Sequence, residues 1–255
     1  MPFDAERMLC RLMDLPGRAS RRLLGQPQID YRAVLFDELR TRLAGREPSR
    51  VLEIGPRDGE DTKRLTSLNQ KHTVLVDLPN REEWIRSWLP VLAPASVELL
   101  VGNLMYDTRI EALEPFDVVW CTGVLYHNPE QLRMMRRLFD LTKPGGVLVM
   151  ESATARRPGL RHENVVEIWY PADKAKMRPL HISTNVTHLP SRRAMQSWME
   201  MVGFEDIRLS ACHRAVGRGL AADRAAFIGL RPTTTAKSAT YYSSVGLNYE
   251  MGLSR

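Results

Sequence analysis

The sequence has few cysteines and no long apolar segment, and these absences exclude several classes of protein. Its three cysteines, Cys10, Cys121 and Cys212, are far apart in a chain of 255 residues. Neither a disulfide framework nor a cysteine-based zinc site is therefore expected. No apolar run reaches transmembrane length, and the amino end lacks the apolar core of a signal peptide. We expect a cytoplasmic protein that is not bound to a membrane.

Two further features limit the choice of ligand. The chain has a formal net charge of +6 and a pI near 9.4, but the excess comes mostly from scattered arginines, which favours ordinary solvated faces over a nucleic-acid surface. The glycine-bearing turn near residue 55 also lacks the G-x-G-x-x-G pattern that marks dinucleotide-binding domains. A nicotinamide dehydrogenase is thus the poorest of the functions considered.

The stretch 51–59, with sequence VLEIGPRDG, is the most informative in the chain. Its apolar start is typical of a buried strand, Gly55 and Gly59 indicate a tight turn, and a helix follows. This is the first half of a nucleotide-binding unit, and Gly55 lets backbone approach a ligand because it has no Cβ. Acids in and after the turn would repel a pyrophosphate. Glu53 instead suits a cationic, amine-bearing ligand such as S-adenosylmethionine (SAM).

Glu53 to Gly59 resembles the first motif of the class I SAM-dependent methyltransferases, acid-x-Gly-x-Gly-x-Gly. It departs from that motif at Arg57, where the middle glycine is expected. Arg57 either pairs with the carboxylate of the donor or points to solvent. The resemblance implies an α/β fold of Rossmann-like type, with a seven-stranded, mostly parallel sheet and helices on both faces.

Further donor-binding residues are expected at the ends of later strands. A predicted strand at 73–76 ends in Asp77, 24 residues after Glu53, where a carboxylate commonly accepts both ribose hydroxyls. A helix-capping or turn aspartate is the alternative. After a predicted strand at 97–101, the resemblance implies that Asn103 holds the adenine edge. The other expected donor contacts are Leu78, Leu104, Cys121, Thr122 and Gly123.

A strand at 116–121 and a well-signalled helix come next. Asn128 is expected to cap this helix, with Pro129 at its first position and Gln131 completing a capping box. Lys143–Gly146 is expected to stop it, before a strand at 147–150.

The segment GVLYH, at 123–127, is similar to the tRNA uridine-5-oxyacetate methyltransferase family, whose members use carboxy-SAM. The likeness continues at 176–178 (KMR) and in a helix and strand at 191–207. The joint order of these segments is more specific than a single glycine motif.

Catalysis of methyl transfer needs a base only for a hydroxyl or a protonated amine. His127 is the best candidate, since it follows the fourth predicted strand and a histidine titrates near neutral pH. A histidine bonded to backbone at a helix start is an equally supported interpretation. The resemblance implies that Tyr126 steers the methyl group or a donor carboxylate. Glu151, at the end of the strand at 147–150, is a weaker alternative base.

The chain is expected to divide into five parts. These are a helical lid and linker (1–48), a donor-binding core (49–152), a substrate cap (153–190), the rest of the core (191–231) and a flexible tail (232–255). The cap would lie where open α/β sheets bind ligands, and long insertions are usually functional or disordered. Its candidate acceptor-binding residues, together with Tyr126, are Trp169, Tyr170, Arg178 and His181. The histidines show no metal-ligand spacing.

The sequence therefore predicts a SAM-dependent methyltransferase that acts on a small molecule, at oxygen or nitrogen rather than carbon. One alternative is a tRNA-modifying carboxymethyltransferase that uses carboxy-SAM. The residues before the first strand contain no match for the family's long basic domain or for its donor-carboxylate lysine. The second alternative is a non-catalytic SAM-binding protein. A nucleic-acid partner is less favoured, and homo-oligomerisation is left open.

Overall fold

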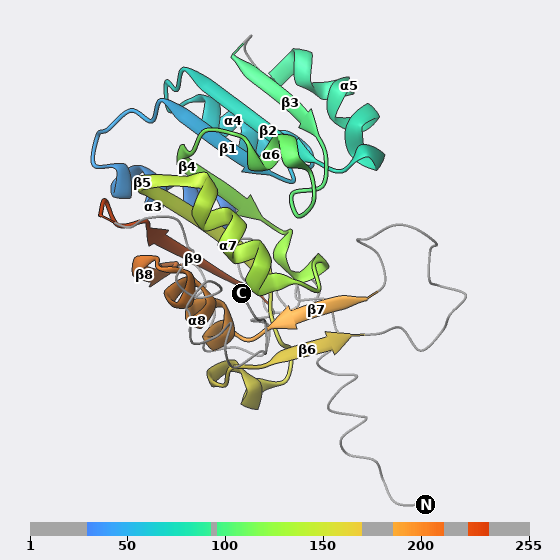
Figure 1. Ribbon diagram of the computed structural model, residues 1–255, viewed down its shortest axis with the longest axis vertical. Helices are drawn as coiled ribbons and strands as arrows, with labels where there is room; N and C mark the ends of the chain where they lie inside the picture. The colour runs from blue at the N-terminus through green and yellow to red at the C-terminus, as the bar shows by residue number, and fades with distance from the viewer. Residues whose placement is uncertain (1–29, 93–95, 170–185, 212–223, 235–255) are drawn as a thin grey trace, which may run out of the picture.

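A seven-stranded sheet forms the centre of the molecule (Figure 1). The computed structural model describes residues 30–92, 96–169, 186–211 and 224–234. The strands of this sheet are β1 (Arg50–Ile54), β2 (His72–Asp77), β3 (Val97–Val101), β4 (Phe116–Thr122), β5 (Thr142–Ala153), β8 (Glu205–Leu209) and β9 (Arg224–Leu230).

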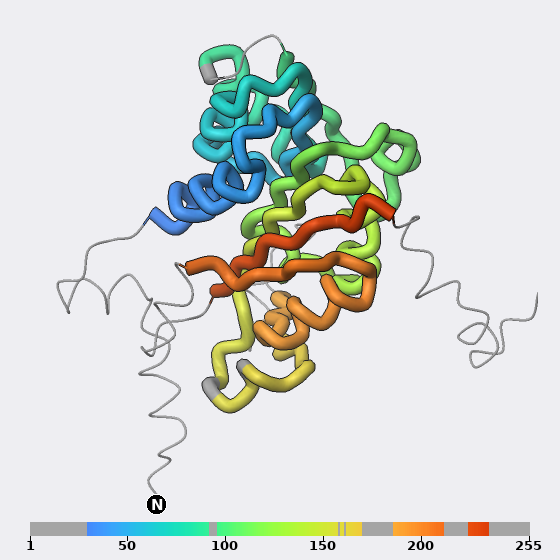
Figure 2. Tube along the Cα trace, turned by 90° about the vertical axis from the view of Figure 1, so that its left-hand side faces the viewer, coloured from blue at the N-terminus to red at the C-terminus, as the bar shows by residue number. Residues whose placement is uncertain are grey.

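The strand order is β3-β2-β1-β4-β5-β9-β8. Strands β1 to β5 pair in parallel, and β9 runs antiparallel to both β5 and β8. Figure 2 shows β8 and β9 side by side, with α8 next to them. The order reverses between β1 and β4, and open sheets bind ligands at the carboxyl ends of their strands beside such a point. The predicted seven-stranded, mostly parallel sheet is confirmed.

Helices cover both faces of the sheet. They are α3 (Tyr31–Leu43), α4 (Glu60–Thr66), α5 (Glu82–Leu92), α6 (Thr108–Glu111), α7 (Gln131–Leu141) and α8 (Arg192–Val202), with 3-10 turns η1 (Pro79–Arg81), η2 (Leu125–His127) and η3 (Pro158–His162). Alternate strand residues point to opposite faces. Val51 and Trp120 therefore pack with α3 and α4, whereas Leu52 and Cys121 pack with α7 and α8.

The helix ends at α3 and α8 are set by local sequence. Asp30 caps α3, because its Oδ1 accepts hydrogen bonds from the amides of residues 32 and 33 at 3.1 and 3.2 Å. Ser191 caps α8 in the same way, accepting from the amide of Ala194 at 2.9 Å. Gly203 ends α8 with φ of 108°, a left-handed conformation that glycine adopts without steric cost. Both helices therefore begin at a side-chain cap.

The start of α7 differs from its prediction. The helix begins at Gln131 and not at Pro129, and its N-cap, Glu130, makes no side-chain capping bond. Asn128 Oδ1 accepts from the amide of Glu130 at 2.8 Å, which closes a turn before the helix. Gln131 is buried and faces inward, so the predicted capping box does not form.

The Lys143–Gly146 segment does not lie between helix and strand, as predicted, but belongs to β5. The pairing of β4 with β5 shifts between Phe116 and Val118, so that the extra residues of β5 bulge there. At Gly146 a Cβ would lie 2.7 Å from the carbonyl oxygen of Lys143. The Pro-Gly-Gly turn therefore acts as a strand bulge.

A small antiparallel hairpin, β6 (Val166–Trp169) with β7 (Thr187–Pro190), stands apart from the main sheet. Strand β7 packs against η2 and β5, so the hairpin lies at the carboxyl end of the sheet (Figure 1). It falls in the predicted substrate cap, which sequence periodicity left unassigned. Residues 1–29 of the predicted helical lid and linker and most of the predicted tail lie outside the described residues.

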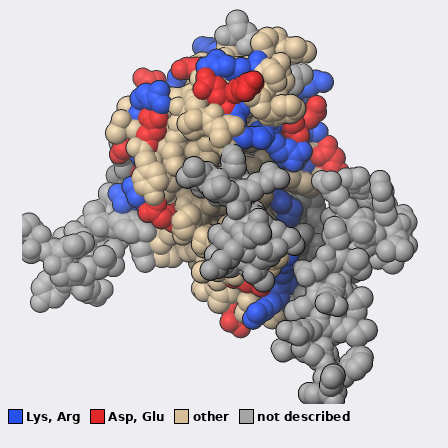
Figure 3. Space-filling model, turned by 90° about the vertical axis from the view of Figure 1, so that its right-hand side faces the viewer, with Lys and Arg blue, Asp and Glu red and all other residues tan. Residues whose placement is uncertain are grey.

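The charged side chains on this side of the molecule are mixed in sign. Figure 3 looks onto the side toward which β3 and β4 run, and it shows Lys and Arg interleaved with Asp and Glu at the top and a group of basic side chains lower down. This matches the scattered charge expected from the sequence. Among the described residues, no helix has the length and apolar character needed to cross a membrane.

Candidate active site

The turn between β1 and α4 requires glycine at two positions. Gly55 has φ of 73° and Gly59, the N-cap of α4, has φ of 80°. A Cβ on Gly55 would lie 2.7 Å from a methyl carbon of Val124. The sequence predicted that the missing Cβ of Gly55 leaves room for a ligand. In the structure, the missing Cβ also leaves room for Val124, in the loop after β4. The amide of Gly55 also donates to the carbonyl of Val76 at 2.9 Å, which ties the turn to β2.

Arg57 occupies the middle-glycine position with φ of 34°, an unfavourable conformation for a residue with a Cβ. Its guanidinium donates to Asp58 Oδ2 from Nε at 3.0 Å and from Nη2 at 2.6 Å. The side chain is 61% exposed. Pairing of Arg57 with the carboxylate of the donor stays a prediction.

Glu53 is a buried carboxyl group at the carboxyl end of β1. The hydroxyl of Thr62 donates to its Oε2 at 2.6 Å. Burial, followed by the nearby charge of Asp61, raises the pKa of Glu53 to about 8. A buried acid at this position gains from a cation, because a positive charge restores the ionised form.

Asp61 is the best-bound acid of the site, and the sequence analysis missed it. It is buried and accepts hydrogen bonds from Trp120 Nε1 and Thr122 Oγ1, each at 3.1 Å. Arg64 donates to its other oxygen at 3.2 Å. Trp120 and Thr122 are two residues apart on β4 and therefore share the face toward α4, and their pairing with Asp61 is evident only once α4 packs on that face.

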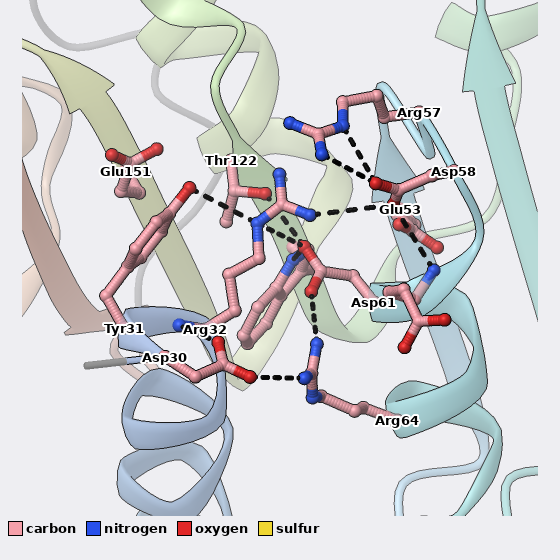
Figure 4. Close-up of polar contacts among 12 residues, drawn as sticks. Asp30, Tyr31, Arg32, Glu53, Arg57, Asp58, Asp61, Arg64, Thr122 and Glu151 are labelled. Atoms are coloured by element: carbon pink, nitrogen blue, oxygen red, sulfur yellow. Dashed lines mark hydrogen bonds and ion pairs between the residues drawn. The ribbon is translucent and has the colours of Figure 1, made fainter. Parts of the chain in front are cut away.

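The amino end of α3 reaches the same site, although the sequence analysis gave it no role there. Arg32 lies 3.5 Å from Asp61 and 3.7 Å from Asp58, atom to atom. Its Nε also donates to the hydroxyl of Tyr31 at 3.2 Å. Figure 4 shows its guanidinium pointing between Tyr31 and the two aspartates. Arg32 thus balances part of the negative charge of the site.

Asp77 and Asn103 stand at the ends of neighbouring strands β2 and β3, as expected for a nucleoside site. The amide of Leu78 donates to Asp77 Oδ1 at 2.7 Å, and burial raises the pKa of Asp77. Asn103 Oδ1 accepts from the amide of Met105 at 2.9 Å, and a carbonyl oxygen retains a second lone pair. Leu104 is buried beside it. Their donor-binding roles stay predictions.

The residues after β4 divide between core and site. Cys121 is buried among the apolar residues under α7, and burial, with the charge of Glu151, raises the pKa of its thiol to about 12. Its side chain therefore serves the core. Thr122 holds Asp61, and Gly123, with φ of 73°, donates its amide to the carbonyl of Glu151 at 3.0 Å.

Tyr126 and His127 lie together on η2, with ring centroids 4.0 Å apart. The Nδ1 atom of His127 is buried without a hydrogen-bond partner among the described residues. Burial, followed by the charge of Arg224, lowers the pKa of His127 to about 4. The expectation that His127 titrates near neutral pH is therefore wrong, and its imidazole is neutral at pH 7.

Glu151 is fully buried and bound to Arg224 through two hydrogen bonds, one from Nε and one from Nη2, the latter at 2.7 Å. The guanidinium also lies near two aromatic rings, 5.6 Å from the centroid of Tyr126 and 5.9 Å from that of Tyr31. A carboxylate engaged in this way is a poor base, which argues against that candidate role for Glu151. Sequence reasoning missed Arg224 because it lies far along the chain, in an antiparallel strand.

The hairpin contributes one described acceptor-binding candidate. Trp169 is 45% exposed, and the guanidinium of Arg156 lies 5.1 Å from its ring centroid. Tyr170, Arg178 and His181 lie outside the described residues. The role of Trp169 stays a prediction.

A family model described as a methyltransferase domain matches residues 28–209. The chain belongs to this family. A relative of this methyltransferase domain, a tRNA U34 carboxymethyltransferase from Chromohalobacter salexigens, is 28% identical over 220 residues, which is 81% of this chain and 60% of that protein. One of the same name from Pseudomonas savastanoi is 33% identical over 169 residues, covering 62% of this chain and 46% of that one. The methyltransferase-domain chain thus spans about half the length of such relatives.

Solved structures show the same fold. An O-methyltransferase family protein from Burkholderia thailandensis superposes with a TM-score of 0.58 at 18% identity, over 91% of this chain and 62% of that one. The N-methyltransferase NodS from Bradyrhizobium japonicum, in complex with S-adenosylhomocysteine (SAH), gives 0.53 at 18% identity, over 87% and 91%.

Proposed function

We propose that this methyltransferase-domain chain transfers a methyl group from SAM to a small-molecule acceptor. The observation that carries the proposal is the buried carboxyl of Glu53 beside Asp61, one strand away from Asp77. Because β1 and β2 are adjacent and parallel, these acids lie at one edge of the sheet. That arrangement suits a nucleoside that carries both a sulfonium and an ammonium group.

Each part of the donor has a proposed partner in the chain. Glu53, with the negative charge of Asp61 behind it, would meet the ammonium and sulfonium, and Asp77 would accept the ribose hydroxyls. Asn103 and Leu104 would hold the adenine. Bound SAM supplies a methyl carbon on a positively charged sulfur. The protein then has to hold the acceptor in line and exclude water.

His127 is the proposed base for a hydroxyl or an ammonium acceptor. Its imidazole is neutral at pH 7, so a ring nitrogen is able to take up the proton of a hydroxyl acceptor while the new bond to carbon forms and the bond to sulfur breaks. An ammonium acceptor has to lose its proton first, because only then does its nitrogen have a lone pair for the attack. A pKa of about 4 makes it a weak base, and it accepts the proton only as the acceptor becomes more acidic during the transfer. Tyr126 would orient the acceptor, and residues 153–190 would cover it.

A second candidate function is carboxymethyl transfer to tRNA from carboxy-SAM. It is favoured by the names of the relatives and by Arg224, a half-buried cation beside Tyr126. The Glu151–Arg224 pair has no net charge, and an additional donor carboxylate would meet the edge of the guanidinium that Glu151 does not use. A non-catalytic SAM-binding role is the third candidate. A location in the cytoplasm and a possible nucleic-acid partner belong to the same proposal.

The test is to identify any nucleoside that co-purifies with the protein by mass spectrometry, and then to titrate SAM, SAH and carboxy-SAM by calorimetry. We expect binding of SAM or SAH. Preference for carboxy-SAM would move the conclusion to the second candidate. No heat with any of the three, on folded protein, would refute the function. A bound donor without turnover across hydroxyl, amine and tRNA acceptors would support the non-catalytic role.

A further inference from the structure

Trp84 makes a hydrogen bond to the donor-binding turn that neither the motif nor the family resemblance explains. It lies in the first turn of α5, and its indole is 54% exposed. Its Nε1 nevertheless donates to the main-chain carbonyl oxygen of Arg57 at 2.7 Å. Helix α5 thus holds the loop between β1 and α4 at its middle residue.

The contact falls on the residue whose backbone is least favourable in this turn. Arg57 has φ of 34°, where a Cβ crowds the backbone. The turn has one internal backbone bond, from the amide of Gly59 to the carbonyl of Pro56 at 2.8 Å. Within the described part of the chain, the side chain of Arg57 bonds to the neighbouring Asp58 and not to the backbone of the turn. A glycine at this position would adopt the same conformation without strain.

We propose that Trp84 is a positioning residue for donor binding. By fixing the carbonyl of Arg57 it holds the turn in the conformation that starts α4 at Gly59, and so keeps Asp61 and Thr62 in place under Glu53. The indole thus compensates for the replacement of the middle glycine by arginine. The inference rests on the proposed function, because the turn is taken as the site of the adenosyl donor.

The first test compares two tryptophans on one helix. Trp84→Phe keeps an aromatic ring and removes the N–H. Trp88→Phe is the matched control, because Trp88 Nε1 is buried without a hydrogen-bond partner among the described residues. SAH is titrated into each full-length variant by calorimetry. We expect Trp84→Phe to raise the Kd about fivefold, the typical effect of one hydrogen bond, and Trp88→Phe to change it by less than about twofold.

The second test separates backbone strain from side-chain contacts. Arg57→Gly removes the strain, whereas Arg57→Ala removes only the guanidinium. If the indole compensates for strain, Trp84→Phe will still raise the Kd about fivefold in the Arg57→Ala background and less than about twofold in the Arg57→Gly background. An equal increase of the Kd on Trp84→Phe in both backgrounds would refute the proposal that Trp84 compensates for strain at Arg57. A merely structural role of Trp84 does not depend on the residue at position 57.

A third measurement needs no ligand and separates the two proposals. Hydrogen exchange of the Gly59 amide reports the turn itself, because that amide closes the turn onto Pro56. We expect about fivefold faster exchange in Trp84→Phe and the parent rate in Trp88→Phe. Unchanged exchange and unchanged Kd refute the positioning role. Faster exchange in a protein that binds neither SAM, SAH nor carboxy-SAM would support the role of Trp84 in holding the turn and would refute the proposed function.

Discussion

The two halves of the candidate site differ in how fully their polar groups are paired. The donor half comprises Glu53, Gly55, Thr62, Asp61, Arg32, Asp77, Trp120 and Thr122, and the acceptor half comprises Tyr126, His127, Glu151, Thr154, His188 and Arg224. In the donor half, the single carboxylate of Asp61 accepts hydrogen bonds from three side chains, those of Arg64, Trp120 and Thr122. In the acceptor half, three buried atoms have no hydrogen-bond partner among the described residues. They are Nδ1 of His127, Nδ1 of His188 and Oγ1 of Thr154.

The difference fits a site with one constant ligand and one variable ligand. Buried polar groups are almost always satisfied in a folded protein, so unpaired atoms beside a paired network point to a missing partner. In the proposed function, the donor half is preorganised for a cation, because hydrogen bonds already hold Glu53 and Asp61 in place. In the proposed function, the unpaired atoms of the acceptor half are available to the acceptor, whereas Glu151 and Arg224 are bound to each other.

The largest effect is expected at that pair. Arg224→Ala leaves the carboxylate of Glu151 buried without its partner, so we expect the free energy of unfolding to fall by about 3 kcal/mol. Urea denaturation measures it. Arg208→Ala is the control, because Arg208 is 66% exposed in its pair with Asp206, and such surface pairs contribute little to stability. Equal losses in the two variants would show that the Glu151 pair contributes no more than a surface pair.

The next prediction asks whether the halves act separately. Asp77→Ala removes the carboxylate expected to accept two ribose hydroxyls, and the loss of such charge-assisted bonds should raise the Kd for SAH about 100-fold. His127→Ala, in the acceptor half, should leave this Kd within about twofold and lower turnover instead. Calorimetry measures both affinities. A large loss of SAH affinity in His127→Ala would show that the acceptor half also contributes to donor binding, so that the two halves do not act separately.

The pH dependence of stability tests the donor half at Glu53. Its pKa is about 8 in the folded protein against the ordinary value of 4.5, so between these values the folded state binds one more proton than the unfolded state. Stability from this group is therefore complete below about pH 4.5 and is lost as the pH rises through 8. We expect the Tm of the parent to fall over this range more steeply than that of Glu53→Gln.

Binding of SAM at pH 7 extends the same test. A cationic ligand favours the ionised carboxyl, so the parent should release about one proton on binding. Calorimetry in buffers of different ionisation enthalpy measures that release. Glu53→Gln should show none, and proton release of the same size in both proteins would place the titrating group elsewhere.

The sequence predicted the donor half better than the acceptor half for a physical reason. The sequence pattern at strand ends is local, because a short apolar run and a turn signal can be recognised from neighbouring residues. Such strand ends hold Glu53, Gly55 and Asp77. Asp61 and Arg224 became part of the site only through pairing across β4 and β9. No local pattern marks such a partner, since it depends on which strands the chain brings together.

The same reason explains the errors. His127 follows a strand, as expected, but its pKa depends on burial and on Arg224, a residue 97 positions further along the chain. The capping-box pattern was present at Gln131, but the side chain instead donates hydrogen bonds to the carbonyls of Leu125 and His188. The order of elements was therefore predictable, while the chemistry of individual side chains depended on packing.

The smallest predicted effect concerns Gln131, which joins the hairpin to the acceptor half. Its Nε2 donates to the carbonyls of Leu125 at 3.1 Å and His188 at 2.5 Å, so one buried amide links η2 to β7. Gln131→Met keeps the volume and removes both bonds, and we expect a loss of about 1.5 kcal/mol in the free energy of unfolding. Gln196→Met, which removes an exposed contact to Glu200, is the control and should cost less than about 0.5 kcal/mol.

The location of the loss decides what Gln131 does. If the amide links the two elements, hydrogen exchange should accelerate at the backbone amides of β6 and β7 and not in β1 or β2, because the donor half is held by its own network. Uniform acceleration across the sheet would mean that Gln131 supports the core as a whole. In that case the hairpin would have no separate attachment to η2, and the boundary between the two halves would lie elsewhere.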